Sequence, residues 1–196
     1  MNQESKVALV TGAASGLGEA IAQRLAADGM VVVVADIDMA NAGRVAKALT
    51  ASSISLKLDV TQEQDWVEAI AAIEQQFGRL DVLVNNAGIT TMGTVEDLTL
   101  EAFKHEFSID VDGTFLGCKH GIGLMKKNGG AIINMSSAAG IKASSLLCAY
   151  NAAKGAVTML TKSVALHCAE QKNGIRCNSV HPGAIHTAII DKTLAQ

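Results

Sequence analysis

Short apolar runs alternate along the chain with longer stretches in which apolar residues recur at helical spacing. Six apolar runs are predicted to be strands, over residues 7–10, 31–34, 54–58, 80–84, 131–135 and 175–180. The amphipathic stretches between them predict helices at about 16–28, 41–49, 62–78, 100–127 and 147–171. We expect Thr61 to be the N-cap of the third helix.

The strands are apolar on both faces, as the four consecutive valines at 31–34 show. Such strands are typical of a parallel sheet that is covered by helices on both sides. The β-α order repeats without a linker, a solenoid repeat or a low-complexity segment. The pattern therefore predicts an α/β fold with a doubly wound parallel sheet, in a single domain over residues 1–196.

The composition and net charge argue against several classes of partner. With 196 residues, 49% of them hydrophobic, the chain can form a sizeable core. The net charge is −3 and no basic stripe occurs, which argues against nucleic acid and anionic membranes. No apolar run approaches the roughly 20 residues of a membrane span, and the polar N-terminus lacks a signal-peptide core.

The four cysteines are spaced irregularly, without a C-x-x-C pair. We expect free thiols in a cytoplasmic protein, with no metal site and no disulfide framework.

A glycine-rich turn at residues 11–18, Thr-Gly-Ala-Ala-Ser-Gly-Leu-Gly, joins the first strand to the first helix. Its glycines, Gly12, Gly16 and Gly18, allow a backbone to approach a pyrophosphate at the helix N-terminus. The spacing differs from G-x-G-x-x-G, and a tight turn without a ligand is the alternative. The position between strand and helix favours a dinucleotide site.

Asp36 ends the second predicted strand, about 20 residues beyond the glycines. A carboxylate there can accept from both ribose hydroxyls and would repel a 2′-phosphate. Ser15 is neutral, Ile37 is apolar, and no basic residue is placed nearby, so NAD is favoured over NADP. A solvated acid at a strand end is the alternative.

Tyr150 and Lys154 are four residues apart, which places them on one face of a predicted helix. Ser137 closes the strand-like run thirteen residues before this tyrosine. An unperturbed phenol has a pKa near 10, so a base at neutral pH needs a nearby positive charge to stabilise the phenolate. These groups could move a proton on and off an alcohol oxygen, or be an ordinary exposed pair and a strand-end hydroxyl.

Further motifs follow in order: Asp59-Val60, Asn85-Asn86-Ala87-Gly88, and Pro182-Gly183 before Thr187. Together with the glycine turn and the serine, tyrosine and lysine, they resemble the classical short-chain dehydrogenase/reductase family over almost the whole chain. The stretch 103–125 is most similar to bacterial hydroxysteroid and cyclic-alcohol dehydrogenases. The resemblance implies a Rossmann fold, an NAD-dependent oxidoreductase acting on CH–OH groups, and a homo-oligomer, either a tetramer or a dimer.

The resemblance also implies residue roles. Tyr150 would be the general acid/base, Lys154 would stabilise its phenolate and bind the nicotinamide ribose, and Ser137 would orient the substrate oxygen. The cofactor would contact Gly12, Ser15, Gly16, Leu17, Gly18, Asp36, Ile37, Asp59, Val60, Asn86, Ala87, Gly88, Tyr150, Lys154, Pro182, Gly183, Ile185 and Thr187.

Asp110 departs from the pattern, because the family usually has an asparagine there, in a proton relay that starts at Lys154. Negative charge favours an ammonium and disfavours a phenolate. We therefore expect Asp110 to join the catalytic group and to shift activity to higher pH or slow the relay.

The family typically continues beyond Gln196, and residues 189–196 are similar to the start of a substrate lid. We expect the lid and a seventh strand to be missing from this sequence. A hydrophobic cyclic or steroid-like alcohol or ketone is the expected substrate, near Leu146, Leu147, Met92 and Ala139. The alternatives are a reductase of acyl-thioester or sugar carbonyls, and a non-catalytic NAD-binding scaffold.

Overall fold

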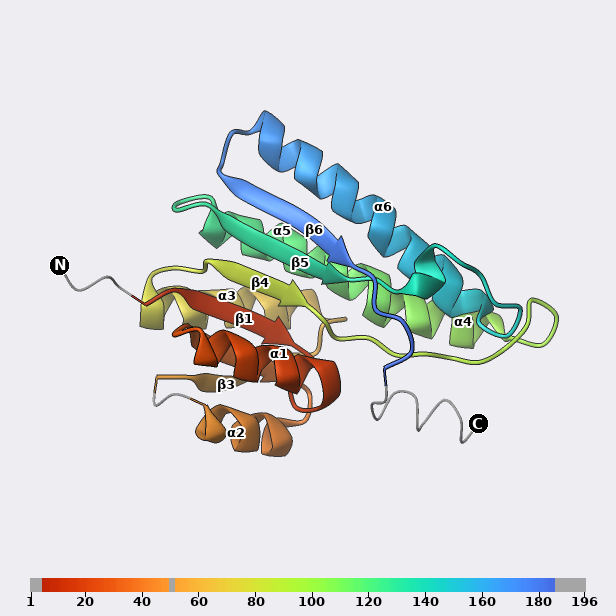
Figure 1. The fold of residues 1–196 in the computed structure, drawn as a ribbon, viewed down its shortest axis with the longest axis horizontal. Helices are drawn as coiled ribbons and strands as arrows, with labels where there is room; N and C mark the ends of the chain where they lie inside the picture. The colour runs from red at the N-terminus through yellow and green to blue at the C-terminus, as the bar shows by residue number, and fades with distance from the viewer. Residues whose placement is uncertain (1–4, 50–51, 186–196) are drawn as a thin grey trace.

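The computed structural model describes residues 5–49 and 52–185. Its centre is a six-stranded parallel sheet in the order β3-β2-β1-β4-β5-β6 (Figure 1). The strands are β1 (Val7–Thr11), β2 (Val31–Asp36), β3 (Ile54–Lys57), β4 (Val82–Asn85), β5 (Gly130–Met135) and β6 (Ile175–Val180). The predicted doubly wound α/β fold is confirmed.

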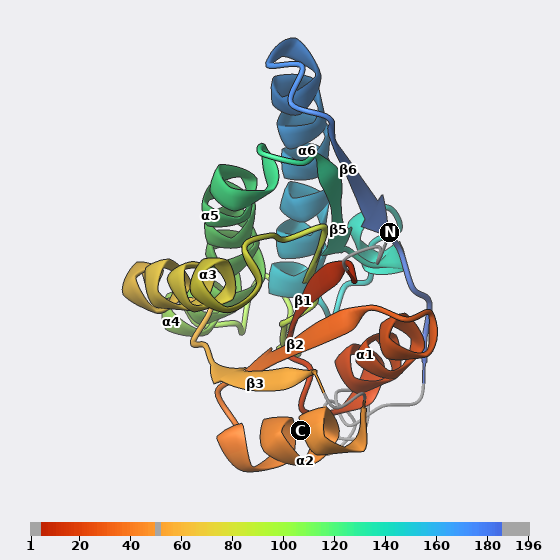
Figure 2. The same ribbon diagram turned by 90° about the vertical axis from the view of Figure 1, so that its left-hand side faces the viewer.

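Helices cover both faces of the sheet, as Figure 2 shows. The helices are α1 (Gly16–Ala27), α2 (Met39–Ala48), α3 (Glu63–Phe77), α4 (Leu100–Phe107), α5 (Gly113–Met125) and α6 (Cys148–Glu170). One core cluster joins the sheet to α3, α5 and α6, around Trp66 and Leu83. The other joins it to α1 and α2, around Val32 and Val45. The valine-rich β2 contributes to both clusters, which explains why it has no polar face.

The chain crosses the sheet between β3 and β4, so β1 and β4 become neighbours although three helices separate them in sequence. In open α/β sheets, ligands bind at the carboxyl ends of the strands where the order reverses in this way. The topology therefore places a ligand site at the ends of β1 and β4, before any side chain is considered.

Two local predictions differ from the structure. The stretch predicted as one α-helix over 100–127 is helical over 100–125, but α4 and α5 are joined by a π-helical turn, η1 (Ser108–Asp112). The N-cap of α3 is Gln62, not Thr61. The Thr61 hydroxyl instead donates to Asp59 Oδ1 at 2.7 Å, so it stabilises the loop before the helix.

No helix within residues 5–49 and 52–185 is long and apolar enough to cross a membrane. All four cysteines are free; Cys118, Cys168 and Cys177 are buried and Cys148 is partly buried.

Two glycines of α5 give a matched test of its packing. A Cβ on Gly117 would lie 2.1 Å from Asn85 Oδ1 and 2.8 Å from the Trp66 ring, whereas a Cβ on Gly123 would meet nothing within 4 Å. We expect Gly117→Ala to lower the free energy of unfolding by about 1–3 kcal/mol through overpacking. We expect Gly123→Ala to raise it by up to about 1 kcal/mol, because alanine favours the helix.

Urea unfolding of both variants measures the difference. Equal effects of the two substitutions would contradict the close packing of α5 on Asn85 and Trp66.

Candidate active site

A cavity of about 580 Å³ lies at the carboxyl ends of the strands. Each of the six strands supplies a wall residue at its end or within two residues after it: Gly12, Asp36, Leu58, Asn86, Ser137 and Pro182. The predicted site residues that line it are Gly12, Ser15, Gly16, Leu17, Gly18, Asp36, Ile37, Asp59, Val60, Asn86, Ala87, Gly88, Ser137, Tyr150, Lys154, Pro182, Gly183 and Ile185. Asp110 is not in the wall, and Thr187 lies outside the described residues.

The glycine turn leaves room for a ligand because side chains are excluded from it. Gly12 and Gly16 have φ of 61° and 57°, where a Cβ is strained. A Cβ on Gly18 would lie 2.2 Å from the Gly12 carbonyl oxygen. The N-cap of α1, Ser15, makes no side-chain hydrogen bond to the helix, so the first N–H groups of α1 keep their capacity to bind an anion.

The segment after β4 holds the turn in place. The Asn86 side-chain amide donates to the carbonyls of Thr11 and Gly12, at 2.9 and 3.2 Å. In return, Thr11 Oγ1 accepts from the backbone N–H groups of Asn86 and Ala87, at 3.0 and 3.1 Å. The glycine turn and the Asn86–Ala87 segment are therefore one rigid wall of the cavity.

Asp36 ends β2 beside this wall. Its Oδ2 accepts from the Ala14 N–H and its Oδ1 from the Asp38 N–H, both at 3.0 Å. Each carboxylate oxygen has two lone pairs, so each can still accept from a ribose hydroxyl. The residues thus fit the adenosine half of a dinucleotide.

A basic residue lies beside the glycine turn, although none was expected there. Arg44 on α2 donates to the Ala14 carbonyl at 3.3 Å, beside the glycine turn. Its guanidinium is paired with both oxygens of Glu19, at 2.9 and 3.0 Å. The pairing holds the pKa of the Glu19 carboxyl below its usual value. Arg44 is 30 residues from Ala14 in the sequence, so no local pattern indicated that the two residues are in contact.

Ser137, Tyr150 and Lys154 line the same cavity. Lys154 Nζ lies 5.5 Å from the centre of the Tyr150 ring, one turn away on α6. Lys154 Nζ also donates to the Met135 carbonyl at 3.0 Å, which connects it to the end of β5. The Ser137 hydroxyl oxygen accepts from the Ala139 N–H at 3.1 Å and so caps the short turn η2 (Ala138–Gly140).

Two further residues position this group. Ser136, which is buried, donates to the Lys154 carbonyl at 2.9 Å and joins β5 to α6. His181 connects the end of β6 to the segment after β5. Its ring nitrogens contact Ser179 Oγ at 2.9 Å and the Ser137 carbonyl at 3.1 Å. Neither role could be foreseen, because both depend on contacts between segments that are far apart in the sequence.

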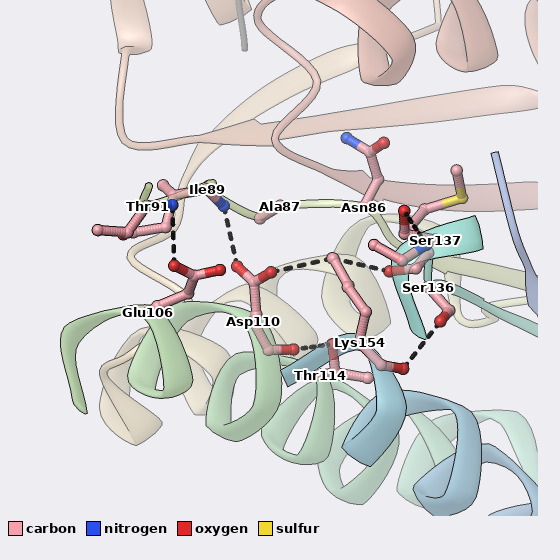
Figure 3. Close-up of polar contacts among 12 residues, drawn as sticks. Asn86, Ala87, Ile89, Thr91, Glu106, Asp110, Thr114, Ser136, Ser137 and Lys154 are labelled. Carbon is pink, nitrogen blue, oxygen red and sulfur yellow. Dashed lines mark hydrogen bonds and ion pairs between the residues drawn. The ribbon is translucent and has the colours of Figure 1, made fainter. Parts of the chain in front are cut away.

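Asp110 lies behind the cavity wall and directly contacts Lys154. Asp110 Oδ2 is 3.0 Å from Lys154 Nζ, and Oδ1 accepts from the Ile89 N–H at 2.9 Å (Figure 3). The side chain is completely buried. Burial raises the pKa of the Asp110 carboxyl above its usual value, and the ammonium and the N–H oppose that rise.

Glu106 is a second buried carboxyl, four residues before Asp110 and beside it in Figure 3. Its Oε2 accepts from the Thr91 N–H at 2.9 Å, and its Oε1 has no hydrogen-bond partner among the described residues. Burial raises its pKa to about 7, and the nearby Asp110 adds to the rise. The i, i+4 spacing of two acids on one helix face was the signal that could have revealed this residue.

Two of the four apolar residues predicted near the substrate line the cavity. Leu147 and Ala139 line it, together with Ile89 and Ile109, whereas Met92 and Leu146 do not. Among the described residues, no group of three or more His, Cys, Asp or Glu side chains is arranged to hold a metal ion.

Comparisons with known proteins agree with this geometry. Residues 6–196 match the family model described as short chain dehydrogenase. The chain is 40% identical to a 3-beta-hydroxysteroid dehydrogenase of Comamonas testosteroni, over 97% of this chain and 75% of that protein. It is 43% identical to a trans-4-hydroxycyclohexanecarboxylate dehydrogenase of Sinomonas cyclohexanicum, over 93% and 73%.

A solved structure, the 3-ketoacyl-(acyl-carrier-protein) reductase of Brucella melitensis complexed with NADH, superimposes with a TM-score of 0.92. It is 34% identical to this chain, and the match covers 98% of this chain and 81% of that one.

The raised pKa of the buried Glu106 predicts that the stability of the protein depends on pH. Its pKa is raised from 4.5 to about 7, so the folded state binds the proton more tightly than the unfolded state. Its contribution is therefore fully present below pH 4.5 and is lost as the pH rises through about 7. The loss is about 3 kcal/mol, and Glu106→Gln should remove this part of the pH dependence.

Urea unfolding between pH 5 and 8 compares Glu106→Gln with Glu101→Gln, which removes an exposed carboxyl from the same helix. Parallel stability curves for the wild type and Glu106→Gln would show that Glu106 is not a buried acid.

Proposed function

Because the chain belongs to the short-chain dehydrogenase family, we propose that it transfers a hydride between NAD(H) and a secondary alcohol or ketone. The observation that carries the proposal is one cavity whose walls combine two sets of residues. The glycine turn and Asp36 form the first set, and Ser137, Tyr150 and Lys154 form the second. A scaffold that only bound a nucleotide would need the first set alone.

The residues of the second set have complementary roles. Tyr150 takes the proton from the alcohol oxygen during oxidation and returns it to the ketone oxygen during reduction. The Lys154 ammonium, 5.5 Å from the Tyr150 ring centre, stabilises the phenolate form. The Ser137 hydroxyl donates to the substrate oxygen as negative charge develops there. When bound, the nicotinamide supplies or accepts the hydride.

NAD rather than NADP is the proposed cofactor. Asp36 retains acceptor positions for ribose hydroxyls, and its charge disfavours a 2′-phosphate. Arg44 does not reverse this preference, because its guanidinium is already paired with Glu19. The NADH in the related reductase structure agrees with this choice.

A hydrophobic cyclic or steroid-like alcohol is the proposed substrate. Leu147, Ile89 and Ile109 give apolar lining to the cavity that Tyr150 also lines. The names of two relatives, a hydroxysteroid and a hydroxycyclohexanecarboxylate dehydrogenase, support the same class. The structural likeness to a ketoacyl reductase makes reduction of an acyl-thioester carbonyl the second candidate.

We further propose a cytoplasmic homo-oligomer, a dimer or a tetramer. Phe115 on α5 and Met159 and Leu166 on α6 are exposed, and large exposed apolar side chains favour association between copies. The four cysteines are free thiols, as is usual in a reducing compartment.

Loss of the Tyr150 hydroxyl tests catalysis. Tyr150→Phe should lower kcat by about 10²–10⁴-fold, because general acid/base catalysis contributes that much. NADH affinity, measured by fluorescence titration, should change little. A panel of cyclic ketones with NADH, and an acyl-thioester ketone beside them, identifies the substrate class. Tight NADH binding by a wild type that turns over none of these ketones would instead support the scaffold.

A change of charge at Asp36 tests the cofactor. Asp36→Asn keeps an acceptor for the Ala14 N–H but loses the charge. We expect kcat/KM for NAD to fall by about 10–100-fold, since hydrogen bonds to a charged acceptor contribute roughly 1.5–3 kcal/mol. The kcat/KM for NADP should rise. An unchanged NAD/NADP ratio would mean that Asp36 does not select the cofactor.

A further inference from the structure

Two buried carboxyls share one ammonium behind the cavity wall. Glu106 and Asp110 have no exposed surface, and Lys154 is 5% exposed. Asp110 contacts the ammonium at 3.0 Å, whereas the hydrogen-bond partner of the Glu106 carboxyl among the described residues is the Thr91 N–H. One ammonium neutralises one carboxylate, and an unpaired buried charge is strongly unfavourable. The geometry thus makes Asp110 the anion and Glu106 the protonated acid.

From this geometry, and on the basis of the proposed dehydrogenase function, we infer that Glu106 is a positioning residue that controls the charge beside Lys154. With a proton on Glu106, the group Glu106–Asp110–Lys154 is neutral. Without it, the group has a net charge of −1, buried next to the catalytic ammonium.

The backbone supports this assignment. The Ile89 and Thr91 N–H groups are two residues apart on the segment after β4, and each donates to one of the two carboxyls (Figure 3). The same segment lines the cavity through Gly88 and Ile89. The two acids are therefore held side by side directly behind the proposed catalytic group.

Few other charges act on Glu106. The charged groups that act on it are the Asp110 carboxyl of η1 and the Lys154 ammonium of α6. The segment after β4 contributes the Thr91 N–H. Burial is the largest cause of the rise in the Glu106 pKa to about 7. Glu106 therefore loses its proton near neutral pH.

The sign of the effect on Tyr150 follows. A negative charge near Lys154 favours the ammonium and disfavours the phenolate of Tyr150. As Glu106 ionises, oxidation of the alcohol, which needs the phenolate, is displaced to higher pH. Reduction, which needs the phenol, persists to higher pH.

The first experiment is the pH profile of kcat for alcohol oxidation. Glu106→Gln keeps the acceptor for the Thr91 N–H but cannot ionise, so we expect the rise in kcat to occur about one pH unit lower than in the wild type. Glu101→Gln, on the exposed face of α4, should leave the profile unchanged. Glu106→Met is the second uncharged variant, used if the glutamine variant does not fold.

The second experiment detects the proton itself. The infrared C=O stretch of a protonated carboxylic acid should disappear near pH 7 in the wild type and be absent from Glu106→Gln. In Asp110→Asn it should disappear at lower pH, because one negative neighbour is lost and Lys154 becomes available to Glu106.

The outcomes separate the inference from the proposed function. An unchanged kcat profile in Glu106→Gln, or an infrared titration that this substitution leaves in place, would overturn the inference while the dehydrogenase remains. A wild type without turnover on any ketone or alcohol would overturn the proposed function, and the role of Glu106 in it, even if the infrared band titrates.

Discussion

The Lys154 ammonium must be neutralised and hydrogen-bonded, because it is almost completely buried. Two separate parts of the chain meet that requirement: the end of β5 supplies the Met135 carbonyl and η1 supplies the Asp110 carboxylate. Ser136, directly after β5, fixes the helix through the Lys154 backbone carbonyl. A Cβ on Gly88 would lie 3.1 Å from Asp110 Oδ1 and 3.2 Å from Lys154 Nζ, so the segment after β4 must also pass closely over the pair.

The arrangement of the sheet followed from the sequence because its signal is local. Four consecutive valines are typical of a strand with helices on both faces, and β2 contributes to both core clusters. Glycines and polar residues at the strand ends marked the edge where the cavity lies. The interruption of the long helix at η1 could not be read in the same way, because residues 108–112 keep helical periodicity.

The sequence also could not predict which polar residues hydrogen-bond to one another inside the core. Asn85 donates to Asn134 Oδ1 at 2.8 Å, and Asn134 donates to Thr161 Oγ1 at 3.0 Å, all three residues being buried. In the sequence, both asparagines lie at or near the end of an apolar run, where a polar side chain could equally well face solvent. Only the neighbouring positions of β4, β5 and α6 turn them into partners. Glu106 is similar, since its environment depends on the Thr91 N–H, fifteen residues away.

Burial of two acids beside one base has a cost in stability, because pairs of this kind rarely repay the loss of hydration. An apolar residue at position 106 would remove most of that cost and still fill the space beside η1. The chain nevertheless holds both carboxyls with backbone N–H groups, at 2.9 Å each. A glutamate in this place gives the site a charge that changes near neutral pH, which neither an apolar residue nor a lone Asp110–Lys154 pair would provide. In the proposed mechanism, that charge acts on the proton transfer at Tyr150, which gives the second acid behind the cavity wall a role.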